Sequence, residues 1–164
     1  MIDALKKLIA ALRDELQQYG EMLARLDDQQ ELVMRRAAEA VMQTVPLVQH
    51  QSAIIAQARE VRFGAMKLLC SEMGQPENSS FKDLIPHLPP DYRPLLEALV
   101  QENNELLQRI HQRARQNHVL LTRTVESMQR VINSLGIHQT PPVYNESGAM
   151  FAATSSPALY EAVG

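Results

Sequence analysis

The stretch that decides the fold is Leu95–Leu135, LLEALVQENNELLQRIHQRARQNHVLLTRTVESMQRVINSL, which contains no Gly and no Pro. A stripe of mostly apolar residues recurs along it every three or four positions, close to the period of about 3.6 residues of an α-helix. A single helix of about forty residues spans roughly 60 Å, so it must lie against other long helices or offer its apolar face to a partner. The stripe consists of Leu99, Asn103, Leu106, Ile110, Ala114, Asn117, Leu121, Val125, Met128, Ile132 and Leu135.

The composition of the whole chain favours the same secondary structure. The 164 residues suit one domain, aromatic residues make up only 4%, and good helix formers dominate, so we expect an all-α protein. The net charge of -3 indicates no polyanionic or polycationic partner. The single cysteine, Cys70, allows no internal disulfide. No apolar run reaches the ~18 residues of a membrane span, and the N-terminus does not resemble a signal peptide, so we expect a cytoplasmic protein without membrane insertion.

A first helix is expected from about Asp3, because apolar positions there alternate steps of four and three. This is a heptad seam with a period of about 3.5 residues, which is typical of a helix supercoiled against a partner helix. The seam consists of Leu5, Ile9, Leu12, Leu16, Tyr19, Leu23, Leu26, Gln30, Val33 and Ala37.

A second helix is expected to begin with Thr44 as its N-cap and Pro46 in its first turn, and to end near Gly74. Ser80 and Asp83 have the spacing of a capping box for a short helix over residues 81–85. Prolines then interrupt regular structure until the last helix begins near residue 92. The apolar stripe expected for the second helix consists of Leu47, Ile54, Ala58, Val61, Ala65 and Leu68.

These elements predict an elongated antiparallel helical bundle of three long helices and one short helix over residues 1–135. Residues 136–164 are rich in Pro, Ser and Thr and lack periodicity, so a flexible C-terminal tail is expected. The last helix is longer than the second, and an unmatched helix end leaves apolar surface without an intramolecular cover.

No pattern for catalysis or metal binding is found. None of the five histidines follows a Glu by three positions, as a di-metal bundle requires, and none has the residues that follow a phosphotransfer histidine. Nucleotide-binding fingerprints are also missing. The sequence therefore predicts no enzyme, no cofactor and no metal. The arginines of the last helix do not share one face, so they indicate a solvated surface and no nucleic-acid partner.

Three polar or aromatic positions allow two interpretations each. Asn103 and Asn117 lie inside the apolar stripe, where buried amides would fix helix register, or where a partly buried stripe would meet a partner. Tyr144 lies in the expected tail, in the run PPVYNESG. It can be interpreted either as part of a short docking motif or as a tail residue without an explained role.

The run LLEALVQENNELL at positions 95–107, the long helix that follows, and YNESG at 144–148 together resemble the FlgN family of flagellar type III export chaperones. The resemblance covers nearly the whole chain to Gly148. The family pattern has two Asn separated by two residues. Asn103 matches the second, whereas Val100 occupies the first. The spacing from Tyr144 to Gly148 fits the family pattern.

The resemblance implies a chaperone that binds hook–filament junction (hook-associated) proteins in the cytoplasm, shields their terminal helices from premature association and delivers them to the type III export gate. Asn103 and Asn104 would belong to the family motif, and Tyr144 with Gly148 would dock at the gate. The alternative is a structural coiled-coil protein that self-assembles through the seam of residues 5–37 without cargo. The stripe beyond the reach of the second helix predicts the cargo contacts Ile110, Asn117, Leu121, Val125, Met128 and Ile132.

Overall fold

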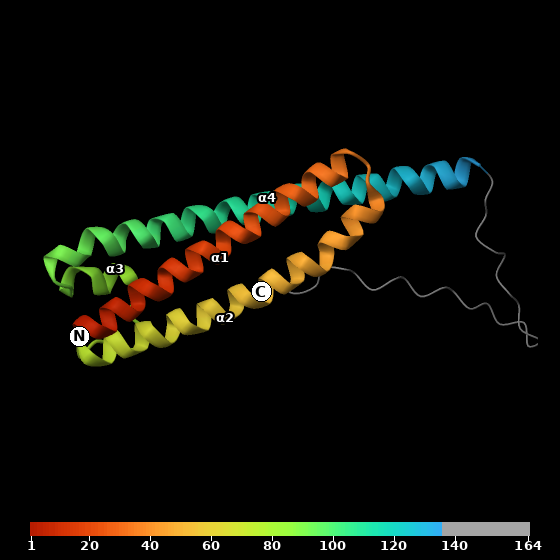
Figure 1. The fold of residues 1–164 in the computed structure, drawn as a ribbon. Helices are drawn as coiled ribbons and strands as arrows, with labels where there is room; N and C mark the ends of the chain where they lie inside the picture. The colour runs from red at the N-terminus through yellow and green to blue at the C-terminus, as the bar shows by residue number, and fades with distance from the viewer. Residues whose placement is uncertain (136–164) are drawn as a thin grey trace, which may run out of the picture. The chain divides into compact units, whose positions relative to one another are not determined.

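A computed structural model describes residues 1–135 as an α-helical bundle (Figure 1). The long helices are α1 (Ile2–Met34), α2 (Ala38–Glu72) and α4 (Arg93–Ser134). The connection from α2 to α4 holds the short helix α3 (Phe81–Leu84) and two 3-10 turns, η1 (Ile85–His87) and η2 (Pro90–Tyr92). These residues contain no strand, which confirms the predicted all-α fold with three long helices and one short one. By its internal contacts the chain divides into two units, Met1–Arg123 and Thr124–Gly164.

Within the first unit, α4 runs parallel to α1. The Nδ2 of Asn103 donates to the backbone oxygen of Leu12 at 3.1 Å, and the Nδ2 of Asn117 donates to that of Leu26 at 2.7 Å. Both pairs are 91 residues apart, so one register holds over two heptads. The α1–α2 hairpin is antiparallel, and it follows that α2 also runs antiparallel to α4.

The heptad seam predicted for the first helix is confirmed as the buried face of α1, because seven of its nine positions up to Val33 are buried and Leu16 and Gln30 are half-buried. The tenth position, Ala37, lies beyond the end of α1. A second row at strict seven-residue spacing is buried beside it, formed by Leu8, Glu15, Met22 and Gln29. One helix that packs against two others needs two such rows. The seam is therefore covered within the chain by α2 and α4.

The predicted start of the second helix is wrong. It begins at Ala38 rather than after a Thr44 cap, and Pro46 lies inside it. The break between α1 and α2 instead falls at Arg36, which has a φ of 56° without being Gly. Pro46 has no N–H to donate to the carbonyl of Met42 one turn earlier, and Met42 lies on the exposed side of α2. The end of α2 is as predicted, with Gly74 at a φ of 66°.

The apolar stripe predicted for α2 is also wrong. Leu47, Val61 and Leu68 are exposed, and of the predicted stripe only Ala58 is buried. The helix is rotated because polar side chains on its other face pair with α1. The residues of α2 that are buried are Val41, Gln51, Ile55, Ala58, Met66, Leu69 and Cys70.

The capping box predicted for α3 is confirmed. The backbone N–H of Asp83 donates to Ser80 Oγ at 3.3 Å, and the backbone N–H of Ser80 donates to the Asp83 carboxylate at 3.2 Å. The Ser80 hydroxyl also donates to the Asp83 carboxylate at 2.6 Å, and this hydrogen bond, followed by the one from the Ser80 backbone, lowers the pKa of Asp83. Leu84 and Leu88 then anchor the connection, since both are almost fully buried.

The core alternates between apolar and polar layers. A first apolar cluster joins the start of α1, the end of α2, the connection and the start of α4, and a second joins the middle of α1 to Ile55 and Ile110. Between them lies Glu15, 2% exposed, with Asn103 beside it on α4. Beyond the second cluster the Nε2 of Gln29 donates to Thr44 at 2.9 Å, and Asn117 donates to Gln29 at 3.1 Å. Hydrogen bonds from these polar side chains thus fix the register between neighbouring helices.

Candidate functional site

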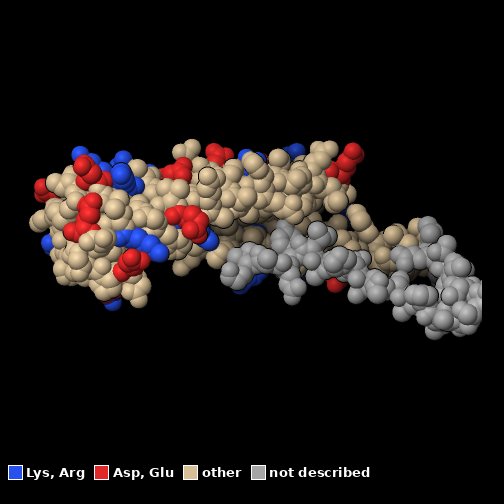
Figure 2. All heavy atoms as spheres, turned by 90° about the horizontal axis from the view of Figure 1, so that it is seen from below, with Lys and Arg blue, Asp and Glu red and all other residues tan. Residues whose placement is uncertain are grey.

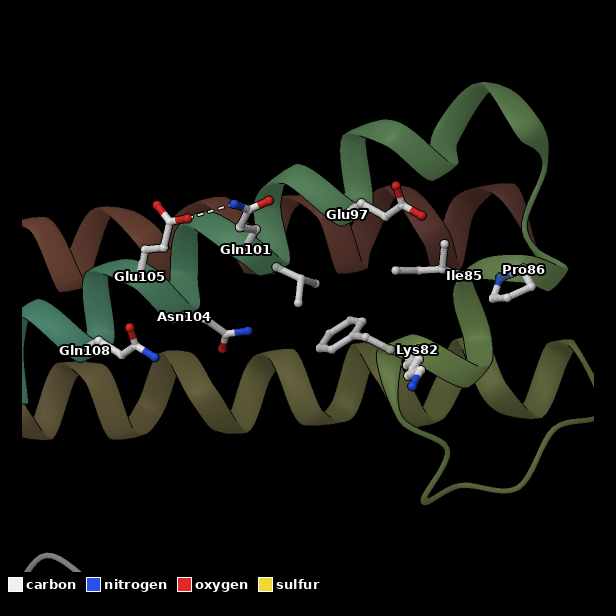
Figure 3. Close-up of a pocket in the computed structure, with 10 residues that line it drawn as sticks. Lys82, Ile85, Pro86, Glu97, Gln101, Asn104, Glu105 and Gln108 are labelled. Atoms are coloured by element: carbon white, nitrogen blue, oxygen red, sulfur yellow. Dashed lines mark hydrogen bonds between the residues drawn. The ribbon is translucent and has the colours of Figure 1, made fainter.

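A hollow lies between the connection and the first half of α4, and we call it the α3–α4 groove (Figure 3). Its cavity volume is about 450 Å³. Ile85 and Pro86 come from the connection, whereas Gln101, Asn104 and Glu105 come from α4. Its other lining residues are Phe81, Lys82, Glu97, Val100 and Gln108. The groove therefore has an apolar floor with a polar rim.

The rim of this groove consists mostly of amides and carboxylates. The Nε2 of Gln101 donates to Glu105 at 2.8 Å, one helical turn on, as the dashed line in Figure 3 shows. Asn104 and Gln108 extend from the same face of α4. Such groups can donate to and accept from a peptide main chain. The groove suits a polypeptide, because apolar side chains such as Ile85 and Pro86 lie beside amides that can pair with a main chain.

The two predicted motif asparagines have different environments. Asn103 is 7% exposed, and its Nδ2 donates to the backbone oxygens of Leu12 at 3.1 Å and Leu99 at 2.8 Å. Asn104 is exposed and lines the groove. Asn103 thus holds α4 against α1, and Asn104 is open to a partner.

The six residues predicted to bind cargo do not share one accessible face. Ile110 is 8% exposed and Asn117 is 2% exposed, and α1 already uses the amide of Asn117. Leu121 is half-buried. Val125, Met128 and Ile132 are 64%, 47% and 38% exposed. α1 continues for eight residues beyond Leu26, whereas α4 continues for seventeen beyond Asn117.

Tyr144 and Gly148, the predicted gate-docking residues, lie outside the described residues, as does the predicted flexible tail 136–164. Within residues 1–135 no group of three His, Cys, Asp or Glu side chains is gathered to hold a metal ion. In the same part of the chain, no helix combines the length and the apolar content that crossing a membrane requires. Burial raises the pKa of the Cys70 thiol and so favours its protonated form.

Charged side chains of both signs are mixed on the face of the described residues shown in Figure 2, without a broad area of one sign. One of the basic residues of α4 is paired: the Nε of Arg113 lies 2.7 Å from the carboxylate of Asp27. The surface in this view therefore lacks the basic stripe that a nucleic-acid site requires.

Sequence reasoning missed a buried charge cluster. Glu15 accepts hydrogen bonds from Arg62 Nε at 2.5 Å and from the Tyr19 hydroxyl at 2.7 Å, and Arg59 Nε lies 3.6 Å from it. Burial, then the hydrogen bond to Glu15, raises the pKa of Tyr19. One signal was available, because Glu15 occupies the second seven-residue row of α1, where a charge needs a partner.

The described residues thus form a helical bundle that leaves apolar side chains of α4 and an amide-rimmed groove open to solvent. A family model described as FlgN protein matches residues 1–151. The chain therefore belongs to the FlgN family, and with it to the flagellar export chaperones. No curated protein and no solved structure matches it.

Proposed function

We propose that this chaperone binds hook–filament junction proteins in the cytoplasm, prevents their premature association and delivers them to the type III export gate. The observation that carries the proposal is the exposed apolar end of α4, in a chain that belongs to a family of export chaperones. Junction proteins that have not yet assembled have amphipathic terminal helices without partners. A helical chaperone can cover such a helix with an apolar face of its own.

The proposed contact is the distal α4 surface, which we define as Leu121, Val125, Met128 and Ile132. These positions follow one another at steps of four, three and four, so they form one stripe along the helix. The predicted contacts Ile110 and Asn117 require α4 to separate from α1, because both side chains are buried. The accessible stripe is the part that can bind without a change in the bundle.

The test is the Val125→Asp variant, with binding of a junction protein measured by calorimetry. Val125 is 64% exposed, so its burial against cargo should stabilise the complex by about 1 kcal/mol, which the variant loses. The variant also has to desolvate a carboxylate, which weakens binding further. We therefore expect binding at least about tenfold weaker and an unchanged helix content. Val61→Asp is the matched control, since Val61 is a 57% exposed valine on α2. Equal affinities of the two variants would show that cargo binds elsewhere.

We also propose that Tyr144 and Gly148 dock at the export gate, as the family resemblance implies. A tethered motif raises the local concentration of its partner, so a weak contact suffices for docking. Tyr144→Ala should keep cargo affinity and lose binding to the gate component. Tyr160→Ala, outside the motif, should retain both. A Tyr144→Ala protein that binds the gate normally would leave the docking role without support.

The alternative is self-assembly without cargo, and one observation favours it. Leu47, Ile54, Val61 and Leu68 repeat at strict seven-residue spacing on α2, and three of them are exposed. The seam of residues 5–37 is covered by α2 and α4, so it is not available for contacts between copies of the chain. Light scattering of the Val61→Asp variant separates the two functions, because only self-assembly predicts smaller particles.

A further inference from the structure

Three hollows of the unit Met1–Arg123 adjoin one another around Phe81. The first is the α3–α4 groove. The second, which we call the arginine pocket, has a volume of about 350 Å³ and is lined by residues of α1, α2, α3 and α4 that include Glu15, Arg59 and Arg62. The third has a volume of about 520 Å³ and lies between α2 and the loop that precedes α3. Phe81 lines all three. The arginine pocket also shares Val100 with the first and Arg62 with the third, so it lies between the other two.

The arginine pocket contains two guanidinium groups, which hydrogen bonds to Glu15 and Tyr19 fix in place. Arg62 donates from Nε to Glu15, and Arg59 donates from Nε to the Tyr19 hydroxyl at 2.9 Å. Every hydrogen bond that either guanidinium makes within residues 1–135 uses Nε. The Nη atoms, which form the outer edge of each fork, thus have no acceptor in this part of the chain.

The charge balance of the pocket favours an anion. Two arginines face one carboxylate, which leaves one uncompensated positive charge. The Glu15 side chain is 3% exposed, whereas those of Arg62 and Arg59 are 17% and 37% exposed, so the positive ends are the accessible ones. Removal of water strengthens a charged hydrogen bond in such a partly enclosed site.

The walls of the pocket are aromatic. Phe63 is 48% exposed, and the Arg62 guanidinium lies 4.4 Å from the centre of its ring. Phe81 forms the opposite side, where the pocket meets the α3–α4 groove. An apolar side chain can therefore rest on the rings beside a carboxylate that the arginines bind.

We propose that the arginine pocket binds the side-chain carboxylate of an Asp or Glu within a polypeptide segment that passes round Phe81. A fork of two N–H groups matches the geometry of a carboxylate. An internal residue fits better than a chain end, because a further hollow adjoins the pocket on each of two sides. The main chain of the segment would meet the amide rim of the α3–α4 groove. The pocket shares no residue with the distal α4 surface, and this inference does not depend on the function proposed for that surface.

The test measures the Nε–Hε NMR signals of Arg59 and Arg62 in the full chain during titration with defined peptides. The probe is acetyl-Ala-Leu-Phe-Glu-Leu-Ala-amide, and the neutral control replaces its Glu by Gln. A third peptide keeps the Gln and has a free terminal carboxylate. We expect the Glu peptide to shift both arginine signals and to bind about tenfold tighter than the Gln peptide, which is the order expected for a charged hydrogen bond.

Arg59→Gln should remove most of this preference for the Glu peptide, and Arg59→Lys should restore part of it, because Lys keeps the charge without the fork. The substitution leaves the fold intact, since Arg59 is partly exposed. Arg113→Gln, at an arginine paired with Asp27, is the matched control and should bind like the parent. Equal binding of the Glu and Gln peptides, or an unchanged preference in Arg59→Gln, would overturn the site. Tighter binding of the peptide with a free terminus would overturn the assignment to a side chain.

Discussion

Replacement of Glu15 by Ala tests how much the buried charge cluster of Glu15, Arg59 and Arg62 stabilises the bundle. The variant leaves Arg62 without its carboxylate partner and removes the acceptor of the Tyr19 hydroxyl. Breaking a fully buried ion pair costs about 3–5 kcal/mol. Arg59 and Arg62 retain 37% and 17% of their side-chain exposure, so water screens part of the loss. We therefore expect the free energy of unfolding to fall by about 2–3 kcal/mol, which is less than for a fully buried pair.

Urea unfolding followed by circular dichroism at 222 nm measures this loss. With a slope of about 2 kcal/mol per molar urea, the midpoint should fall by about 1–1.5 M while the slope stays constant. Glu15→Gln keeps the shape and an acceptor for Tyr19, so its midpoint should lie between those of the parent and Glu15→Ala. Asp14→Ala, at the exposed neighbouring position, should change stability by less than about 0.5 kcal/mol. A Glu15→Ala midpoint equal to that of Asp14→Ala would refute the buried ion pair.

Three further outcomes are expected. Asn117→Ala loses hydrogen bonds to Leu26 and Gln29 and should cost about 1–3 kcal/mol in the same urea assay, whereas Asn104→Ala on the exposed face should cost almost nothing. The raised pKa of Tyr19 means that the folded state holds the phenol proton more tightly than the unfolded state. The stabilisation from the protonated Tyr19 phenol is therefore complete below the ordinary pKa of 10.0 and is lost as the pH rises above it. In Tyr19→Phe the free energy of unfolding should fall less steeply with rising pH in this alkaline range. Ser80→Ala should cost about 1 kcal/mol through loss of the cap and should bring the pKa of Asp83, followed by NMR, back up toward 3.8.

The sequence was sufficient for the helices whose ends or faces carry a strong local signal. The stripe of Leu95–Leu135 predicted α4 to within about two residues, and the Ser80–Asp83 spacing predicted the capping box, because both patterns depend on local geometry alone. The break at Arg35–Ala37 was missed because neither Gly nor Pro marks it.

The buried face of α2 could not be found from its most apolar stripe. Its orientation is set by polar partners on α1: Arg62 bonds to Glu15, and Gln51 donates to the backbone oxygen of Gln18 at 3.1 Å. Pairings between residues more than thirty positions apart leave no periodic signal in either helix. For the same reason the arginine pocket, which four helices assemble, was invisible in the sequence, whereas the exposed apolar end of α4 followed from helix length.

The shared 91-residue spacing between α1 and α4 has a consequence for the synthesis of the chain on the ribosome. α1 and α2 emerge first and are joined by only three residues, so their hairpin can close early. Contacts that close a longer loop cost more entropy and form later, so α4 docks last. Until α4 docks, the face of α1 that α4 covers in the folded bundle remains exposed to solvent. A nascent molecule of this chaperone therefore passes through the same vulnerable state, a helix with a bare apolar face, from which the proposed function would protect its cargo.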